Sequence, residues 1–196
     1  SGMSELVDLT QDDNYFRQSI SGHVRNLLEI SKLDYSQKED TRYFLQSPLI
    51  TKVGISKLQE IVKTYVEISI NIAGNVKKIE ESINVLVINA YGLDSEFKCE
   101  VPIEQISLNC NPYFKSKKNE TAAIESFISQ VVVDFLSYSI GCMMGRYSLD
   151  QKGLVYANSG NEGFSELEQQ GIYKTFPVDD DGIIPITDQE WFADDA

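Results

Sequence analysis

The feature that most constrains the fold is a long periodic stripe of apolar residues in the first half of the chain. Its members are Leu58, Ile61, Tyr65, Ile68, Ile72, Val76, Ile79, Ile83, Leu86 and Ala90. Their mean spacing of about 3.6 residues is the period of an α-helix, sustained for roughly nine turns and about 50 Å. Glu60 suits the first turn after the candidate N-cap Ser56, and Gly92 is the candidate C-cap. A helix of this length with one stripe is half of an antiparallel hairpin or a rigid spacer, and both roles are structural.

A second stretch, from about Glu120 to Asp150, has the same period and a wider apolar band. The band contains Ile124, Phe127, Ile128, Val131, Val132, Phe135, Leu136, Ile140 and Met143. It predicts a central core helix that is buried on most of its surface, with Asn119 as its cap. Gly141 and Gly145 are expected to share a helical face where another backbone comes close. The chain has no uninterrupted apolar run of about 18 residues, which predicts packing in a soluble core rather than a membrane span.

Helical periodicity is also present near the N-terminus, over residues 15–30, and predicts a shorter helix there. Residues 1–15 are acidic and turn-rich and are predicted to be a flexible lead. The Ser-Gly pair before Met3 is typical of the scar that tag removal leaves. Residues 31–55 lack clear periodicity and are expected to form an ordered connector.

The remaining segments complete a mainly α fold class. Between the two main helices the sequence is extended and polar, and residues 101–103 and 106–108 are expected to be short strand-like pieces. After Asp150 regular periodicity is lost, apart from one helical turn after Ser165. We therefore predict long antiparallel amphipathic helices that form a small bundle over residues 16–150, with extended connectors. Residues 151–196 are predicted to be an irregular acidic arm that packs on this helical domain.

Charge restricts the possible partners of the chain. The 196 residues include 30 acids and 17 bases, which gives a formal net charge of −13. A protein that binds DNA or RNA alone needs a basic surface, because phosphate neutralisation supplies much of the affinity. The whole chain is therefore a poor candidate for a free-standing nucleic-acid binder. The charge is also uneven, because no Lys or Arg follows Lys174 while seven acids lie between Asp179 and Asp195.

Cysteine and histidine usage argues against a metal site. Cys99, Cys110 and Cys142 form no C-x-x-C pair, and His23 is the only histidine. These spacings predict neither a zinc site nor a disulfide framework, and they favour a reduced, cytoplasmic setting. The sequence does not open with a signal-peptide pattern. We predict that this chain itself binds no metal and no cofactor.

Two short motifs resemble sequences that bind a base or a metal ion. Asn-Pro-Tyr-Phe at residues 111–114 resembles the N-P-P-[YF] motif with which adenine methyltransferases hold a flipped base. The second proline is missing and no glycine-rich cofactor motif precedes it, so a structural turn is favoured. Asp-Asp-Asp-Gly at residues 179–182 lacks the downstream Glu of a calcium loop and is interpreted as a solvated acidic turn. Phosphate-binding-loop, serine-hydrolase and zinc-protease motifs do not occur, so we predict no catalytic residue in this chain.

One basic cluster stands beside two aromatic residues. Lys115, Lys117 and Lys118 are either a solvated loop or, within a larger DNA-binding protein, contacts to phosphates. Arg146, at the end of the second main helix, either pairs with an acid such as Asp150 or reaches a nucleic-acid backbone or a partner protein. These four cations are the candidate nucleic-acid contacts.

Three segments resemble one protein family in the same order along the chain. Residues 138–150, Tyr-Ser-Ile-Gly-Cys-Met-Met-Gly-Arg-Tyr-Ser-Leu-Asp, resemble a segment of the PglX-type DNA methyltransferases of BREX phage-defence systems and their type IIG restriction-modification relatives. Residues 88–96 are similar to a helix end that the family writes roughly as F-I-x-x-Y-G-L-x-x-E. Residues 183–195 are similar to its I-I-P-[IV]-x-D-x-E-[WY]-F-x-D-D, and residues 30–35 and 47–49 show a weaker similarity.

The resemblance implies a parent protein that transfers a methyl group from S-adenosylmethionine to the N6 atom of adenine. Proteins of this family are several times longer than this chain, which therefore looks like an excised piece. In the family, the cofactor motif, the N-P-P-[YF] motif and the target-recognition region lie outside this segment, mostly before it. The implied partners are the rest of the methyltransferase chain, double-stranded DNA and other defence-system proteins, with no membrane.

Together these observations predict a helical spacer or scaffold that positions the methyltransferase and target-recognition parts on DNA. The alternative, from another class, is a free-standing acidic interaction module or a mimic of DNA charge that inhibits a DNA enzyme. A charge mimic should spread its acids over the folded surface, whereas many acids of this chain cluster in the tail. A self-sufficient enzyme is disfavoured because no catalytic motif is present.

Overall fold

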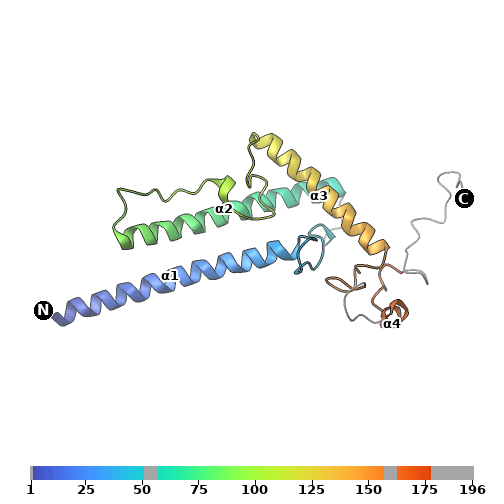
Figure 1. Ribbon diagram of the computed structural model, residues 1–196, viewed down its shortest axis with the longest axis horizontal. Coiled ribbons are helices and arrows are strands. Elements are labelled where there is room, and N and C mark those ends of the chain that lie inside the picture. Colours follow the sequence, from blue (N-terminus) through green and yellow to red (C-terminus); the bar gives the residue numbers. More distant parts are fainter. Residues whose placement is uncertain (1, 51–56, 157–162, 178–196) are drawn as a thin grey trace, which may run out of the picture. The chain divides into compact units, whose positions relative to one another are not determined.

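The computed structural model describes residues 2–50, 57–156 and 163–177. Unit 1 consists of Ser1–Tyr35 and Val62–Ile128, and unit 2 consists of Ser36–Ile61 and Ser129–Ala196. The helices, in order, are α1 (Gly2–Ser36), α2 (Leu58–Tyr91), the 3-10 helix η2 (Ile103–Gln105), α3 (Glu120–Met143) and α4 (Phe164–Gln169) (Figure 1). No strand occurs in the described ranges, and the predicted mainly α class is confirmed. The small antiparallel bundle stays a prediction.

The long periodic stripe forms α2, as predicted, with Glu60 in its first turn. Gly92 follows the helix directly and has a positive φ of 64°. Its N–H donates to the Asn89 carbonyl at 3.2 Å, and the N–H of Leu93 donates to the Ile88 carbonyl at 3.0 Å. This is the Schellman ending, in which a left-handed glycine lets the last carbonyls of a helix find donors. The expected N-cap, Ser56, lies outside the described residues.

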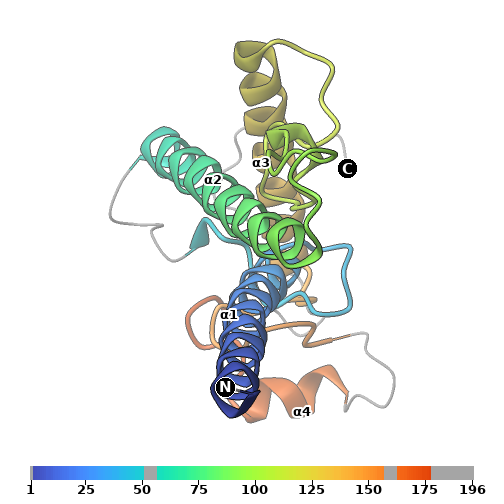
Figure 2. The same cartoon turned by 90° about the vertical axis from the view of Figure 1, so that its left-hand side faces the viewer.

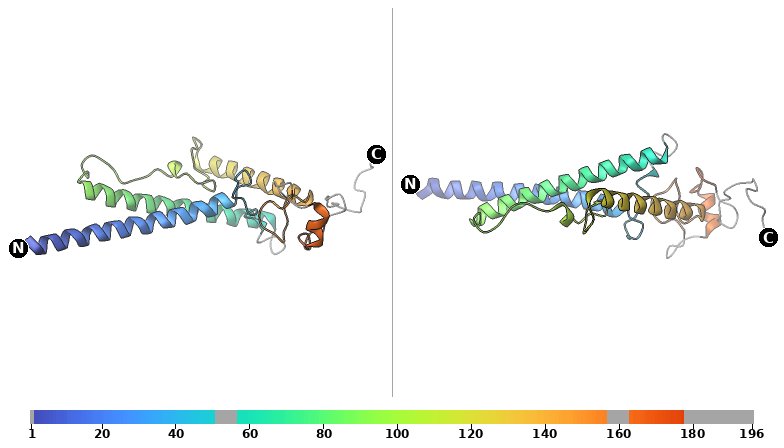
Figure 3. Two further views of the ribbon diagram at one scale, coloured as in Figure 1. Left: turned by 60° about the horizontal axis from the view of Figure 1, so that its bottom comes forward. Right: turned by 90° about the horizontal axis from the view of Figure 1, so that it is seen from above.

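Helix α1 extends beyond the predicted residues 15–30 in both directions. Ser21 and Gly22 do not interrupt it, since one glycine costs a helix only about 1 kcal/mol relative to alanine. Within unit 1, α1 and α2 run side by side in opposite directions and cross at an angle (Figures 2 and 3). The apolar cluster at this contact includes Leu27, Ile30, Ile72 and Val76. Unit 1 also contains the first turns of α3, where Phe127 stacks on Tyr65 of α2 with ring centroids 6.2 Å apart.

The connection between α2 and α3 folds into turns and η2 instead of the predicted strand-like pieces. The reason is Asn111, whose buried side-chain amide donates to the carbonyls of Ile103 at 2.9 Å and Ile106 at 2.8 Å. One side chain thus donates hydrogen bonds to two backbone carbonyls, which in a β-strand would accept hydrogen bonds from a neighbouring strand. Ile106, Leu108 and Cys110 are buried in the cluster that contains Val76.

A buried carboxylate joins the end of α1 to this connection. Asp34 is 6% exposed and accepts hydrogen bonds from the backbone N–H groups of Asn109 and Cys110, both at 2.8 Å. The side-chain amide of Asn109 donates a third, at 3.0 Å. Burial, and then the nearby Asp34 carboxylate, raise the pKa of the Cys110 thiol. Cys110 is therefore a protonated, packed side chain rather than a reactive thiolate.

Three aromatic rings form the centre of unit 2. Phe44 meets Tyr138 and Tyr147 edge-on, with ring centroids 5.8 and 5.2 Å away, and the two tyrosines stack at 5.3 Å. Aromatic pairs of this kind contribute about 0.5–1.5 kcal/mol beyond the area they bury. Cys142 completes the cluster, and the hydroxyl of Tyr147 donates to the carboxylate of Glu39 at 3.0 Å.

Unit 2 is expected to lose stability at alkaline pH. Burial and then the hydrogen bond to Glu39 raise the pKa of Tyr147 to about 12, and burial also raises the pKa of Tyr138. An unfolded tyrosine ionises near pH 10, so the unfolded state releases its proton first. Stability should therefore be full below about pH 10 and fall by about 1–2 kcal/mol as the pH approaches 12. Urea unfolding between about pH 10 and pH 12 measures this fall in stability. In the variant Tyr147→Phe the fall should be smaller. A urea midpoint of the unchanged protein that stays constant over this pH range would contradict the expectation.

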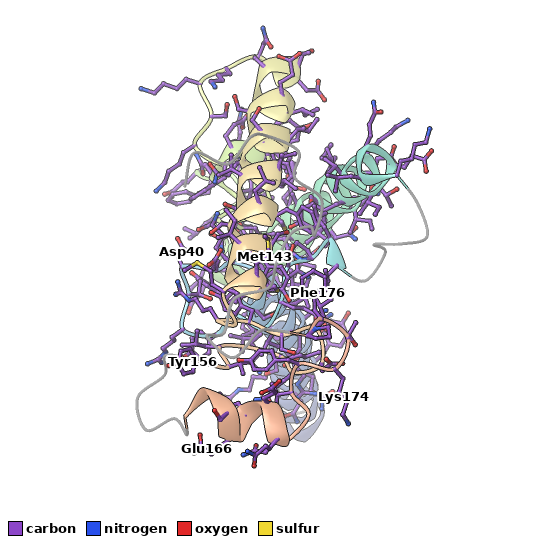
Figure 4. All side chains as sticks on the ribbon, turned by 90° about the vertical axis from the view of Figure 1, so that its right-hand side faces the viewer. Asp40, Met143, Tyr156, Glu166, Lys174 and Phe176 are labelled. Atoms are coloured by element: carbon purple, nitrogen blue, oxygen red, sulfur yellow. The ribbon has the colours of Figure 1, made fainter. Side chains whose placement is uncertain are left out.

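A second apolar cluster connects the end of α3 to α4. Val155, Leu167 and Tyr173 are buried, with Met143 and Ile172 packed against them. In Figure 4, α4, marked by Glu166, lies beyond the end of α3, marked by Met143. The helical turn predicted after Ser165 is thus confirmed as part of α4. Gly171 ends this helix with a φ of 75°, and the N–H of Ile172 donates to the Leu167 carbonyl at 3.3 Å, again as in a Schellman ending.

Candidate nucleic-acid interface

The basic loop, Lys115–Lys118, belongs to unit 1 and is held by its backbone. The N–H of Lys115 donates to the Glu104 carbonyl at 2.9 Å, and the N–H of Ser116 donates to the Tyr113 carbonyl at 2.9 Å. Lys115 adopts a left-handed φ of 53°, a conformation that costs an ordinary residue about 1–2 kcal/mol. The loop therefore presents its lysines from a defined turn rather than from an unstructured chain.

The lysine side chains of the basic loop are exposed. The Nζ atom of Lys115 lies 4.8 Å from the centroid of the Phe114 ring, and that of Lys118 donates to the Ser126 hydroxyl at 2.5 Å. Lys117 is exposed. The ion pairs found in the described ranges are Lys32–Glu29, Lys38–Asp134 and Lys77–Glu81. None of the three lysines of the basic loop is therefore neutralised by a carboxylate in the part of the chain that the structure describes.

A groove of about 400 Å³ lies beside the basic loop. Its lining includes Lys118 but also two acids, Glu104 and Glu120. The hydroxyl of Tyr113 donates to Glu120 at 3.2 Å, and burial together with this carboxylate raises the pKa of Tyr113. The acids make the groove unsuitable for a phosphate, so a nucleic-acid backbone would contact the outer side of the loop.

The Asn-Pro-Tyr-Phe segment at residues 111–114 forms a turn. Asn111 is 5% exposed, and besides its two donated hydrogen bonds its Oδ1 atom accepts the N–H of Tyr113 at 3.0 Å. In an adenine methyltransferase the corresponding oxygen must be open to accept the target amine. Here that oxygen is already used inside the turn, so this segment does not have the geometry of the catalytic motif.

Arg146 belongs to unit 2, so no single unit holds all four candidate contacts. Its guanidinium lies 5.4 Å from the centroid of the Tyr147 ring. The predicted pair with Asp150 is not formed among the described residues, because this carboxylate accepts the Thr175 hydroxyl at 2.6 Å and the Thr175 N–H at 2.7 Å. These two hydrogen bonds lower the pKa of Asp150. Arg146 itself is exposed.

The motif at residues 138–150 forms the end of α3 and the turn that follows. Gly145 adopts a φ of 67°, and the N–H of Arg146 donates to the Gly141 carbonyl at 2.8 Å. The helix ends at Met143, so the prediction that Gly141 and Gly145 share a helical face is wrong. Gly145 is instead the left-handed residue of a third Schellman ending.

Gly141 makes room for an aromatic ring rather than for another backbone. A Cβ atom at this position would lie 2.6 Å from Cδ2 and 2.7 Å from Cε2 of Tyr147. The turn after the helix is fixed further by the Tyr173 hydroxyl, which donates to the Gly145 carbonyl at 2.6 Å. Tyr138, Cys142 and Tyr147 of this motif thus lie in the core of unit 2. Ile140, Met144 and Arg146 are exposed, and the motif lines no open site among the described residues.

Helix α3 is far more exposed than predicted. Among the described residues, α3 is the one helix that is long and apolar enough to cross a membrane, judged by length and composition only. The core helix of a soluble protein can have the same length and composition. Only 22% of the residues in its apolar 18-residue window are buried. Four large apolar side chains are more than half exposed: Val133 (57%), Leu136 (53%), Ile140 (55%) and Met144 (60%). The prediction that this helix is buried on most of its surface is wrong.

The chain is similar over most of its length to two adenine-specific methyltransferases. Over 195 residues, 95% of its length, the chain is 38% identical to the adenine-specific methyltransferase BrxX of Escherichia coli strain HS. The chain is a homologue of a segment of the PglX-type adenine-specific methyltransferases. It is also 28% identical over 176 residues to the adenine-specific methyltransferase PglX of Lacticaseibacillus casei strain Zhang. The PglX-type segment spans only 16% and 13% of the lengths of these two relatives. No protein-family model matches the chain.

Two of the three motifs that carry the family resemblance of this PglX-type segment lie at helix ends. Residues 88–96 contain the Schellman ending of α2, and residues 138–150 contain that of α3. Residues 183–195 lie outside the described residues. The glycine of Met-Gly-Arg was a usable signal for a helix end, because a glycine directly after an apolar helical run is a common stop.

Proposed function

We propose that this PglX-type segment is a helical spacer in a longer adenine-specific DNA methyltransferase. It positions the methyltransferase and target-recognition parts of that protein on double-stranded DNA. The observation that carries the proposal is the 38% identity, across 95% of the chain, to a protein named as an adenine-specific methyltransferase. The parent would use S-adenosylmethionine as its methyl donor, and other defence-system proteins are its further candidate partners.

The geometry of the described residues supports a structural rather than a catalytic role. Helix α2 has 34 residues, which at 1.5 Å per residue gives a rod of about 50 Å. Asp34 and Asn111, both buried, are used in hydrogen bonds that hold the connection between α2 and α3 in place. Among the described residues no cluster of His, Cys, Asp and Glu is suited to hold a metal ion.

The basic loop supplies the proposed contact to DNA. Its three lysines are exposed and free of carboxylate partners in the described ranges, while the chain as a whole carries a charge of −13. A local cationic loop on an acidic spacer positions a duplex without giving high affinity alone, because phosphate contacts fix register and orientation. The net charge also leaves the acidic interaction module as the alternative function.

The test uses the full-length parent and a neutralised basic loop, Lys115→Asn, Lys117→Gln and Lys118→Gln. Asparagine is chosen at position 115 because it tolerates a left-handed backbone. Each lost phosphate contact should lower the slope of log affinity against log salt by about 0.9, so the triple variant should lose up to about 3. Methyl transfer at saturating DNA should be unchanged. The measurement is binding of duplex DNA over a series of salt concentrations.

The matched control removes the same charge elsewhere, with Lys63, Lys98 and Lys152 changed to glutamine. If this control lowers the salt slope as much as the loop variant, the loop has no special contact to DNA. The reading frame around the segment provides a second check. A frame that continues into a glycine-rich cofactor motif and N-P-P-[YF] supports the spacer, whereas a start and a stop codon around the chain would favour the acidic interaction module.

A further inference from the structure

The solvent-exposed face of α3 changes from polar to apolar along the helix. In its first half this face carries polar residues, among them Ser126, Ser129 and Gln130. In its second half the same face carries Val133, Leu136 and Ile140, and Met144, the residue directly after α3, continues this row; we define these four residues as the α3 stripe. The intervals of three and four residues place these side chains in one row. All four belong to unit 2.

The α3 stripe carries no charge. From Gln130 to Gly145 the only ionisable side chain with a charge at neutral pH is Asp134, and it is bound to Lys38 at 2.8 Å and to Gln130 at 2.7 Å. Single exposed apolar residues are normal on a soluble protein, but a contiguous row is typical of an interaction surface. The row covers three helical turns, or about 16 Å at 1.5 Å per residue.

The opposite face of the helix is already covered. Tyr138 and Cys142 are buried in the aromatic cluster of unit 2, and Val131 on the same side of the helix is buried as well. Helix α3 thus has two apolar faces, of which the described residues of unit 2 cover one. A helix that is apolar on both sides is typical of a position between two layers of a larger fold.

We propose that the α3 stripe is an interface inside the longer polypeptide, covered by an apolar, uncharged surface from a part of the parent outside this segment. The inference rests on the proposed function, because it needs a parent. The length outside the segment is sufficient: the chain corresponds to 16% of the relative BrxX. The chemistry of the stripe favours a protein surface over DNA, since the row offers a phosphate neither a cation nor a hydrogen-bond donor.

Cysteine labelling tests the proposal. Leu136→Cys and Ile140→Cys are made separately in the full-length parent and in the 196-residue chain, each with Cys99→Ser to remove the partly exposed native thiol. Maleimide uptake at the new cysteine is followed by peptide mass spectrometry. We expect labelling at least about tenfold slower in the full-length protein, as protection by packing requires. Thr121→Cys, at an exposed position near the start of α3, is the control and should react equally in both proteins.

Equal labelling of the stripe in both proteins would overturn the proposal. Labelling of the stripe that is slower than labelling of the Thr121→Cys control already in the 196-residue chain would also overturn the proposal. The stripe would then be covered by another part of the same chain or, if the labelling rate falls with protein concentration, by a second copy. Leu136→Gln gives an independent readout: it should lower the melting temperature of the full-length protein and leave that of the short chain unchanged. The two proposals can fail separately. If the stripe is protected but the basic-loop variant leaves the slope of log affinity against log salt unchanged, this interface stands and only the proposed contact to DNA is rejected.

Discussion

Replacing Gly141 by alanine is expected to destabilise unit 2 by about 2–3 kcal/mol, because overpacking a filled site forces the backbone or the ring to move. The new methyl carbon would lie 2.6 Å from the ring of Tyr147, which stacks on Tyr138 and meets Phe44. The ring cannot move aside without opening this aromatic cluster. The variant should therefore unfold at a lower urea concentration, as followed by circular dichroism.

Gly74→Ala is the control, since Gly74 is likewise a glycine within a helix, α2. A Cβ atom there meets nothing within 4 Å. The change should stabilise the chain by about 1 kcal/mol, because alanine is the better helix former. The two substitutions add the same atom and are expected to act with opposite signs. A loss of stability in both would contradict the assignment of the effect to Tyr147.

Replacing Asp34 by alanine is expected to cost unit 1 about 3 kcal/mol. The carboxylate is buried and accepts hydrogen bonds from two backbone N–H groups, of Asn109 and Cys110, which the alanine variant would leave without an acceptor. Buried donors that lose a charged partner carry the full cost of desolvation. Hydrogen exchange measures the effect directly: the amides of Asn109 and Cys110 should exchange much faster in the variant.

Asp134→Ala provides the comparison for a partly exposed acid. Its ion pair with Lys38 lies near the surface, where such pairs contribute about 0–1 kcal/mol. The stability of this control should therefore change little. If Asp34→Ala were equally mild, water would be replacing the carboxylate, and the hydrogen bonds to the connection would not be what holds it in place.

Local signals in the sequence were sufficient for the helices themselves. The stripe and Gly92 predicted α2 and its ending, because both depend only on neighbouring residues. Asn119 was correctly expected to cap α3, and its side chain accepts the N–H of Ala122 at 2.9 Å. The extent of α1 and the turns between α2 and α3 were not predicted. The turns depend on Asp34, which bonds to a residue 76 positions away, and no periodic pattern reports such a contact.

The candidate site was predictable in part. The sequence identified the basic loop, and its lysines are exposed as a phosphate contact requires. It did not reveal the partner of Asp150, because Thr175 comes from a distant loop and polar pairs of this kind leave no periodic signal. The exposure of α3 could not be predicted either. An apolar pattern shows that a face will be covered, but not whether the cover comes from the same segment. The division at residues 15 and 150 stays a prediction.

The left-handed glycines after α2, α3 and α4 have a consequence for how such a segment can evolve. At Gly92, Gly145 and Gly171 most other amino acids would have to adopt a backbone that costs them about 1–2 kcal/mol, and asparagine is the main residue that tolerates it. A typical domain has a total stability of only about 5–15 kcal/mol, so two such replacements would consume much of the margin. Residues on the helix surfaces can be substituted at little cost in stability, whereas substitutions at these three positions are expected to be rare. Among related segments, substitutions are therefore expected to accumulate along the helices and to be rare at the glycines that end them.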